Sequence, residues 1–206
     1  MTQAPHGQAG TPGDLQAAAQ TLMLDGLSWL EGSYDQHRFF VERDLVWTLQ
    51  RWLLRESDAR GLPLRILNDY GVEAGPRRSL SADLAILGDS NVPLLAAEFK
   101  FEPSHLRNDI DRRKFPVTDW NGICHDIERI RRWVHEGLVD ESFAVLIDEG
   151  GSVRRRRHAE TDCDWVDWGP HGTDGLAVSI HTFHLRGPAR VRNEKTQKSP
   201  VTTPDN

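Results

Sequence analysis

Two neighbouring apolar segments near the middle of the chain contain charged residues. Residues 80–87 and 92–101 both have the pattern of strands, with a short polar turn between them. Asp83 lies inside the first segment, and Glu98 and Lys100 lie inside the second. Because side chains along a strand alternate between its two faces, Glu98 and Lys100 should share one face, with the residue between them directed into the opposite layer. A charge in an apolar strand is costly unless it is paired or binds a metal, so this strand pair is expected to form a polar site.

The remaining hydrophobic pattern predicts further strands and helices on either side of this pair. Strands are expected at residues 64–72, 142–147 and 176–185, and helices at residues 14–30, 37–56 and 119–136. The long polar segment between the last two strands is expected to be a loop. This order favours an α/β fold with a mixed central β-sheet flanked by helices. The boundaries predict a single domain at residues 13–186, with disordered tails at residues 1–12 and 187–206.

The predicted helix at residues 37–56 has one charged residue on its apolar face. Its apolar residues fill one contiguous arc at 100° per residue, and Glu42 falls in the middle of that arc. A buried carboxylate without a partner is costly, so Glu42 should contact a cation, a basic side chain or an ordered water. A salt bridge to an arginine at the helix edge is the structural alternative.

The composition supports a folded core and excludes some classes of protein. Of the 206 residues, 38% are hydrophobic, with seven Trp and seven Phe. The chain has no run of eighteen apolar residues and no basic-then-apolar N-terminal signal, so neither a membrane partner nor secretion is expected. Cys124 and Cys163 form no CxxC pair and fit a reducing compartment, most simply the cytoplasm. The net charge of −6 does not favour nucleic-acid binding, although local basic patches can still bind phosphates.

The strand pair around Asp83 resembles the PD-(D/E)xK nuclease superfamily, which has the restriction-endonuclease-like fold. Asp83 matches the first acid of the motif, and Glu98-Phe99-Lys100 matches the (D/E)xK tripeptide. The proline that often precedes the first acid is replaced by Ala82. The resemblance covers residues 36–150.

The resemblance implies a magnesium-dependent endodeoxyribonuclease acting on DNA. Asp83, Glu98 and the backbone carbonyl of Phe99 would then be the ligands of Mg²⁺, for which Mn²⁺ can substitute. Lys100 would orient the attacking water or stabilise charge on the phosphate. Glu42 is the candidate for the helical glutamate that holds a metal-bound water in many members of the superfamily.

Further residues are weaker candidates for contact with the nucleic acid. Asp126 and Arg129 are neighbours at the margin of the last predicted helix, where an ordinary solvated ion pair is the more common explanation. Three basic segments could contact phosphates: Arg77 and Arg78, then residues 107–114 with Arg112, Arg113 and Lys114, and finally the run at residues 154–157. The acids at residues 160–167 could instead neutralise the last of these. Trp165 and Trp168 could stack on bases, although hydrophobic anchoring of the loop is the commoner role. His158, Cys163 and His171 lack the spacing of a structural zinc site.

Two alternatives to a nuclease remain open. A non-catalytic module that binds nucleic acid or protein could keep the same fold, although it would have no reason to retain Asp83, Glu98 and Lys100 together. The charges could also form a buried structural network. The sequence leaves open a homodimer and an additional protein partner.

Overall fold

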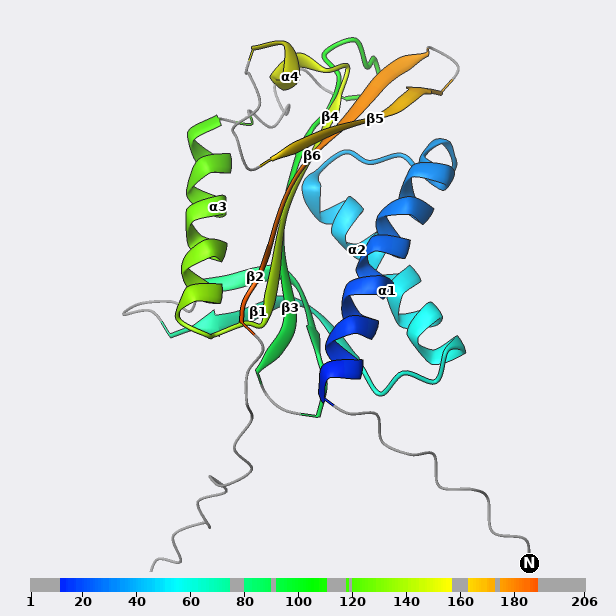
Figure 1. Ribbon diagram of the computed structural model, residues 1–206. Coiled ribbons are helices and arrows are strands. Elements are labelled where there is room, and N and C mark those ends of the chain that lie inside the picture. The colour runs from blue at the N-terminus through cyan, green and yellow to red at the C-terminus, as the bar shows by residue number, and fades with distance from the viewer. Residues whose placement is uncertain are drawn as a thin grey trace, which may run out of the picture.

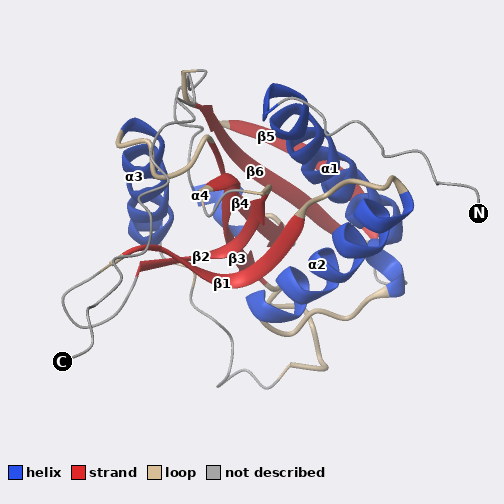
Figure 2. Ribbon diagram, turned by 90° about the horizontal axis from the view of Figure 1, so that it is seen from below, coloured by secondary structure: helices blue, strands red, loops and turns tan. Residues whose placement is uncertain are grey.

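The computed structural model describes residues 12–74, 80–89, 92–110, 118, 120–156, 163–172 and 175–188. One six-stranded sheet crosses the molecule in the order β1-β2-β3-β4-β6-β5. Helices α1 and α2 cover one face of this sheet, and α3 covers the other (Figure 1). The view from below shows the same three layers, with the twisted sheet between α3 and the α1–α2 pair (Figure 2). The prediction of an α/β fold with a mixed sheet flanked by helices is therefore confirmed.

The predicted elements all occur in the expected order, and the structure adds η1, α4 and β5 to them. The strands are β1 (Arg65–Glu73), β2 (Leu80–Leu87), β3 (Pro93–Glu102), β4 (Glu141–Glu149), β5 (Asp164–His171) and β6 (Leu176–Arg186). The helices are α1 (Pro12–Ser33), the short 3₁₀ helix η1 (Tyr34–Gln36), α2 (Glu42–Ala59), α3 (Trp120–His135) and α4 (Ser152–Arg156).

The mixed character of the sheet comes from one parallel pair at its centre. Strands β3 and β4 run parallel, and α3 lies between them in the chain, as a parallel connection requires. The other neighbouring strands pair antiparallel. All nine residues of β4 are buried, as expected for a strand covered on both faces.

Two hydrophobic cores hold the layers together. On one face, Leu49 and Leu53 of α2 and Phe99 of β3 belong to a buried cluster that also includes residues of α1. On the other face, Ile127 and Trp133 of α3 pack in a second cluster with small and aliphatic residues of the sheet. Full burial of a leucine or phenylalanine side chain contributes about 1.5–3 kcal/mol, so these contacts fix both helical layers on the sheet.

The helix predicted at residues 37–56 begins later than expected. Asp44 accepts hydrogen bonds from the backbone N–H groups of Phe40 and Val41, at 3.0 and 3.2 Å. These bonds hold Val41 in an extended conformation, so α2 starts at Glu42. Val41, which the periodicity placed in the apolar arc, is 45% exposed. Glu42 is therefore the first residue of the helix, and it still lies on the same face as the buried Leu45, Val46 and Leu49.

Other boundaries also differ from the prediction. Helix α1 already includes Pro12, which was assigned to the N-terminal tail, and continues to Ser33. The segment expected to be a polar loop contains α4 and β5. Strand β5 is an edge strand that is mostly exposed, so its sequence lacks the apolar alternation of a buried strand. Asp119, the first residue of the helix predicted at residues 119–136, lies outside the described residues.

Asp148 explains why the short helix α4 follows β4. Its Oδ2 atom accepts hydrogen bonds from the backbone N–H groups of Val153 and Arg154, at 3.0 and 2.8 Å. These N–H groups have no partner within a helix that begins at Ser152, and the carboxylate satisfies them.

Across the described ranges, no helix combines the length and the apolar character needed to cross a membrane.

Candidate functional site

The candidate site lies where β2 and β3 separate. Their antiparallel pairing runs from Leu87 opposite Pro93 to Leu84 opposite Ala97. Asp83 and Glu98 are the next residues along the two strands. Beyond this point the Asp83 carboxylate replaces a backbone partner, because its Oδ2 atom accepts a hydrogen bond from the N–H of Phe99 at 2.7 Å. The first acid of the motif is thus fixed beside the tripeptide.

The side chains of the tripeptide alternate as predicted. Phe99 is buried in the core beneath α1 and α2. Glu98 and Lys100 are directed to the opposite side, where both contact α3. Glu98 Oε2 lies 2.7 Å from Arg129 Nη2, and Lys100 Nζ lies 3.0 Å from Asp126 Oδ2.

Glu42 reaches the same site from the other helical layer. Its Oε2 atom lies 3.3 Å from Lys100 Nζ, and its side chain is 34% exposed. Lys100 therefore contacts α2 and α3, which cover opposite faces of the sheet. Of the partners expected for Glu42, the structure shows a basic side chain, and that side chain is Lys100 of β3, not an arginine at the edge of the helix.

Burial raises the pKa values of the three acids predicted to form the site. For Glu98, burial followed by the nearby charge of Asp83 raises the pKa to about 9, against the opposing effect of Arg129. For Glu42, burial raises the pKa to about 7, and Lys100 limits the shift. The pKa of Asp83 is also raised by burial, while the hydrogen bond from Phe99 opposes the change. Groups with such perturbed pKa values are common at functional sites.

The pKa values of the two basic groups, Lys100 and Arg129, are also raised, which for a base favours the charged form. Burial disfavours the charged form of Lys100, but the carboxylates of Glu42, Asp126 and Asp83 outweigh burial and raise its pKa. The same balance raises the pKa of Arg129, with Glu98 as the strongest acidic neighbour. Both side chains therefore carry a positive charge at neutral pH.

The oxygen atoms at this site are suited to a hard divalent cation. Among the described residues, the carboxyls of Asp83, Glu98, Asp126 and Glu42 interact with two basic groups, Lys100 and Arg129, so negative charge is in excess when all are ionised. Glu98 Oε1 is buried and accepts no hydrogen bond from the part of the chain that the structure describes. Its contact with Asp83 becomes a hydrogen bond only when one of the two carboxyls carries a proton. A cation between these acids would offset the excess negative charge and give Glu98 Oε1 a partner. Carboxylate oxygens are ligands that Mg²⁺ prefers.

Positive side chains already contact several of these oxygens. Lys100 Nζ donates to the carbonyl of Phe99 at 3.0 Å, and Arg129 contacts Glu98. Within the part of the chain that the structure describes, no three His, Cys, Asp or Glu side chains are arranged as a ready-made metal site. The residues fit a cation held by Asp83, Glu98 and a backbone carbonyl, provided that the basic groups shift.

Asp126 and Arg129 belong to the site, although a solvated ion pair was the favoured interpretation. Asp126 is only 8% exposed, and its Oδ1 atom lies 2.8 Å from Arg129 Nη2. The sequence contains a signal for this burial, because Asp126 lies between Ile123 and Ile130 at positions i−3 and i+4, and both are buried.

The structure describes only some of the basic residues that were predicted to contact phosphates. Arg77, Arg78, Arg112, Arg113 and Lys114 lie outside the described residues. Arg154 of the arginine run pairs with Asp167 and packs over the ring of Trp165, at 5.7 Å. Trp168 is buried in the core beside Tyr34, which agrees with hydrophobic anchoring.

No protein-family model, no curated protein and no solved structure matches the chain. The resemblance to the PD-(D/E)xK superfamily thus stays a prediction that depends on Asp83, Glu98 and Lys100.

Proposed function

We propose that this protein is a metal-dependent nuclease of the PD-(D/E)xK type that hydrolyses phosphodiester bonds of DNA. One observation carries the proposal. Asp83, Glu98 and Lys100 come together where two central strands separate, in a buried group of charges with an excess of carboxyls. Two acids and a lysine in this arrangement suit a divalent cation and a phosphate ester.

The fold supports the same assignment. Strands β1, β2 and β3 are followed by α3 and the parallel strand β4, and helices cover both faces of the mixed sheet. The PD-(D/E)xK resemblance implies a restriction-endonuclease-like core of this order. Fold alone does not define an activity, so the proposal depends on the site.

Asp83, Glu98 and the Phe99 carbonyl would hold Mg²⁺, with Mn²⁺ as a substitute. When bound, the cation would neutralise a phosphate oxygen and lower the pKa of a water molecule. The backbone holds these ligands in place. The N–H of Phe99 orients the Asp83 carboxylate, and Glu98 and the Phe99 carbonyl both belong to strand β3.

Lys100 and Glu42 supply the remaining chemistry. Lys100 places a positive charge beside the phosphate, and Asp126 and Glu42 hold its ammonium group from two sides. Glu42, with a pKa of about 7, can accept a proton from an attacking water at neutral pH. Cys124 and Cys163 form no disulfide among the described residues, which supports a reducing compartment such as the cytoplasm.

One observation favours a second candidate, a non-catalytic binding module. Lys100 and Arg129 already pair with the acids of the site, as they would in a structural network. Such a module would bind a nucleic acid or a protein without turnover.

DNA cleavage distinguishes the two candidates. Supercoiled plasmid and single-stranded DNA are incubated with the protein in Mg²⁺ or Mn²⁺, with and without EDTA. We expect nicking or cutting that EDTA abolishes and that Asp83→Asn removes, because the variant lacks a ligand charge. Asp89→Asn, at an exposed position after β2, is the matched control and should stay active. DNA binding without cleavage in all conditions would favour the binding module.

A further inference from the structure

One nitrogen of Arg129 bridges the two most buried acids of the site. Its Nη2 atom lies 2.7 Å from Glu98 Oε2 and 2.8 Å from Asp126 Oδ1. Glu98 and Asp126 are only 3% and 8% exposed. A buried carboxylate is strongly destabilised without a positive partner, so Arg129 compensates Glu98 directly.

This ion pair leaves polar atoms of both partners unsatisfied. Glu98 Oε1 and Arg129 Nε are buried, and neither forms a hydrogen bond with the described residues. A guanidinium that serves only to hold a carboxylate usually forms two parallel hydrogen bonds with it. Here a single nitrogen contacts both acids, and the free oxygen of Glu98 remains available for another cation.

Arg129 also has an alternative contact on its own helix. Its Cζ atom lies 5.5 Å from the centre of the Trp133 ring, one turn further along α3. A guanidinium over an aromatic face keeps a favourable interaction for its charge. The side chain can therefore leave Glu98 without losing all of its contacts.

We infer that Arg129 is a built-in counter-cation of Glu98 in the metal-free protein, and that a divalent cation must displace it to bind. This inference rests on the proposed metal site and goes beyond it, because it gives Arg129 a role in setting metal affinity. The guanidinium stabilises the empty site and weakens metal binding by competing for the same carboxylate. Removing it exposes Glu98 to the metal and leaves the metal-free protein with a buried carboxyl that has lost its basic partner.

The test compares Mn²⁺ affinity and thermal stability in Arg129→Gln and in the unmodified protein. Free Mn²⁺ is measured by electron paramagnetic resonance, and unfolding is followed in EDTA and in excess Mn²⁺. We expect Arg129→Gln to bind Mn²⁺ about tenfold more tightly, which corresponds to about 1.4 kcal/mol, because one competing charge is removed. Its melting temperature should fall in EDTA, and Mn²⁺ should raise it by more than it does in the unmodified protein.

Two further variants control for the fold and for general charge. Arg132→Gln changes an arginine of the same helix that pairs with Glu73 of β1, outside the site, and should leave Mn²⁺ affinity unchanged. Arg129→Lys keeps a positive charge and should bind Mn²⁺ with an affinity between those of Arg129→Gln and the unmodified protein. If Arg129→Gln fails to fold, Arg129→Lys should still bind Mn²⁺ more tightly than the unmodified protein does.

The outcomes separate this inference from the proposed metal site. If the unmodified protein binds Mn²⁺ and both substitutions of Arg129 leave that affinity unchanged or weaken it, Arg129 is a structural partner and the inference is wrong. If neither the unmodified protein nor any variant binds Mn²⁺, the metal site itself is wrong and the inference fails with it.

Discussion

Lys100 Nζ lies 3.0 Å from Asp126 Oδ2, and this ion pair joins the central strand β3 to α3. The same nitrogen lies 3.3 Å from Glu42 Oε2 at the start of α2. One ammonium group therefore connects helices on opposite faces of the sheet. Its position depends on carboxylates from both layers, and this dependence leads to the first two predictions.

Replacement of Asp126 should affect turnover more than metal affinity. In Asp126→Asn, Lys100 loses the closest of its carboxylate partners, and we expect the free energy of unfolding to fall by about 1–3 kcal/mol. The cleavage rate should fall because Lys100 is less well positioned, while Asp83 and Glu98 remain as ligands. Urea denaturation and single-turnover cleavage measure the two effects.

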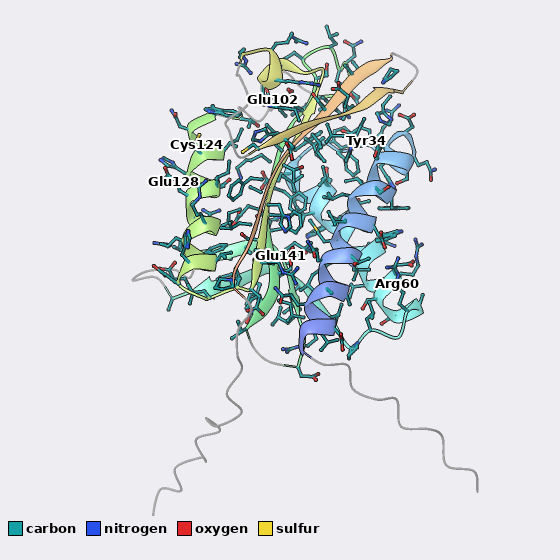
Figure 3. The ribbon with its side chains drawn as sticks, in the orientation of Figure 1. Tyr34, Arg60, Glu102, Cys124, Glu128 and Glu141 are labelled. Atoms are coloured by element: carbon teal, nitrogen blue, oxygen red, sulfur yellow. The ribbon has the colours of Figure 1, made fainter. Side chains whose placement is uncertain are left out.

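Glu128→Gln is the matched control, since Glu128 is exposed on the outer side of the same helix (Figure 3). Equal behaviour of Asp126→Asn and this control would show that Asp126 does not position Lys100.

Glu42 should give the acid limb of the pH profile. Its pKa of about 7 means that the carboxyl loses its proton as the pH rises through neutrality, so the cleavage rate should rise over the same interval. Glu42→Gln should remove this limb and lower the rate without unfolding the protein. A variant that loses stability but keeps the full rate and pH dependence would identify Glu42 as a structural partner of Lys100.

Glu98 should make the metal-free protein less stable as the pH rises. Its pKa is about 9 in the folded protein and 4.5 ordinarily, so between these values the folded state binds more protons than the unfolded state. The contribution is fully present below the ordinary pKa and is lost as the pH rises toward 9, with a slope of at most about 1.4 kcal/mol per pH unit.

Denaturation in EDTA at several pH values measures this slope. Glu98→Gln should flatten the decline between pH 5 and pH 9 because it removes the titrating group, whereas Glu128→Gln should keep it. An unchanged slope in Glu98→Gln would assign the dependence to other groups.

Two glycines should respond to alanine in opposite directions. Gly150, directly after β4, has φ +79°, and an added Cβ atom would lie 2.9 Å from Ser104 Oγ. Gly150→Ala should lower the free energy of unfolding by about 1–3 kcal/mol. Gly122 lies within α3 with no atom near its added Cβ, so Gly122→Ala should raise it by about 0.5–1 kcal/mol. Thermal unfolding of both variants checks the signs, and a stable Gly150→Ala would contradict the packing at the end of β4.

The sequence predicts the centre of this protein well because local patterns determine it. The buried strands β2, β3 and β4 appear as apolar segments, and the two-residue period correctly places Glu98 and Lys100 opposite Phe99. The stripe of α3 is equally clear, since its apolar residues recur at helical spacing from Trp120 to Val134.

The features that the sequence did not predict depend on contacts between distant residues. Strand β5 forms by pairing with β6 at the sheet edge, which requires no apolar alternation of its own. The start of α2 depends on how Asp44 captures two backbone N–H groups. The partner of Glu42 is 58 residues away, and no helical period could identify it as Lys100.

The central claim is that Lys100 acts on the phosphate ester while Asp83 and Glu98 hold the metal. The most direct measurement is the single-turnover rate of DNA cleavage by Lys100→Ala, together with the Mn²⁺ affinity of this variant. Arg51→Ala is the control, because Arg51 is exposed on α2. We expect Lys100→Ala to lose at least about a hundredfold in rate, the typical effect of removing a group that stabilises developing charge, while it still binds Mn²⁺. Full cleavage activity in Lys100→Ala would contradict the claim.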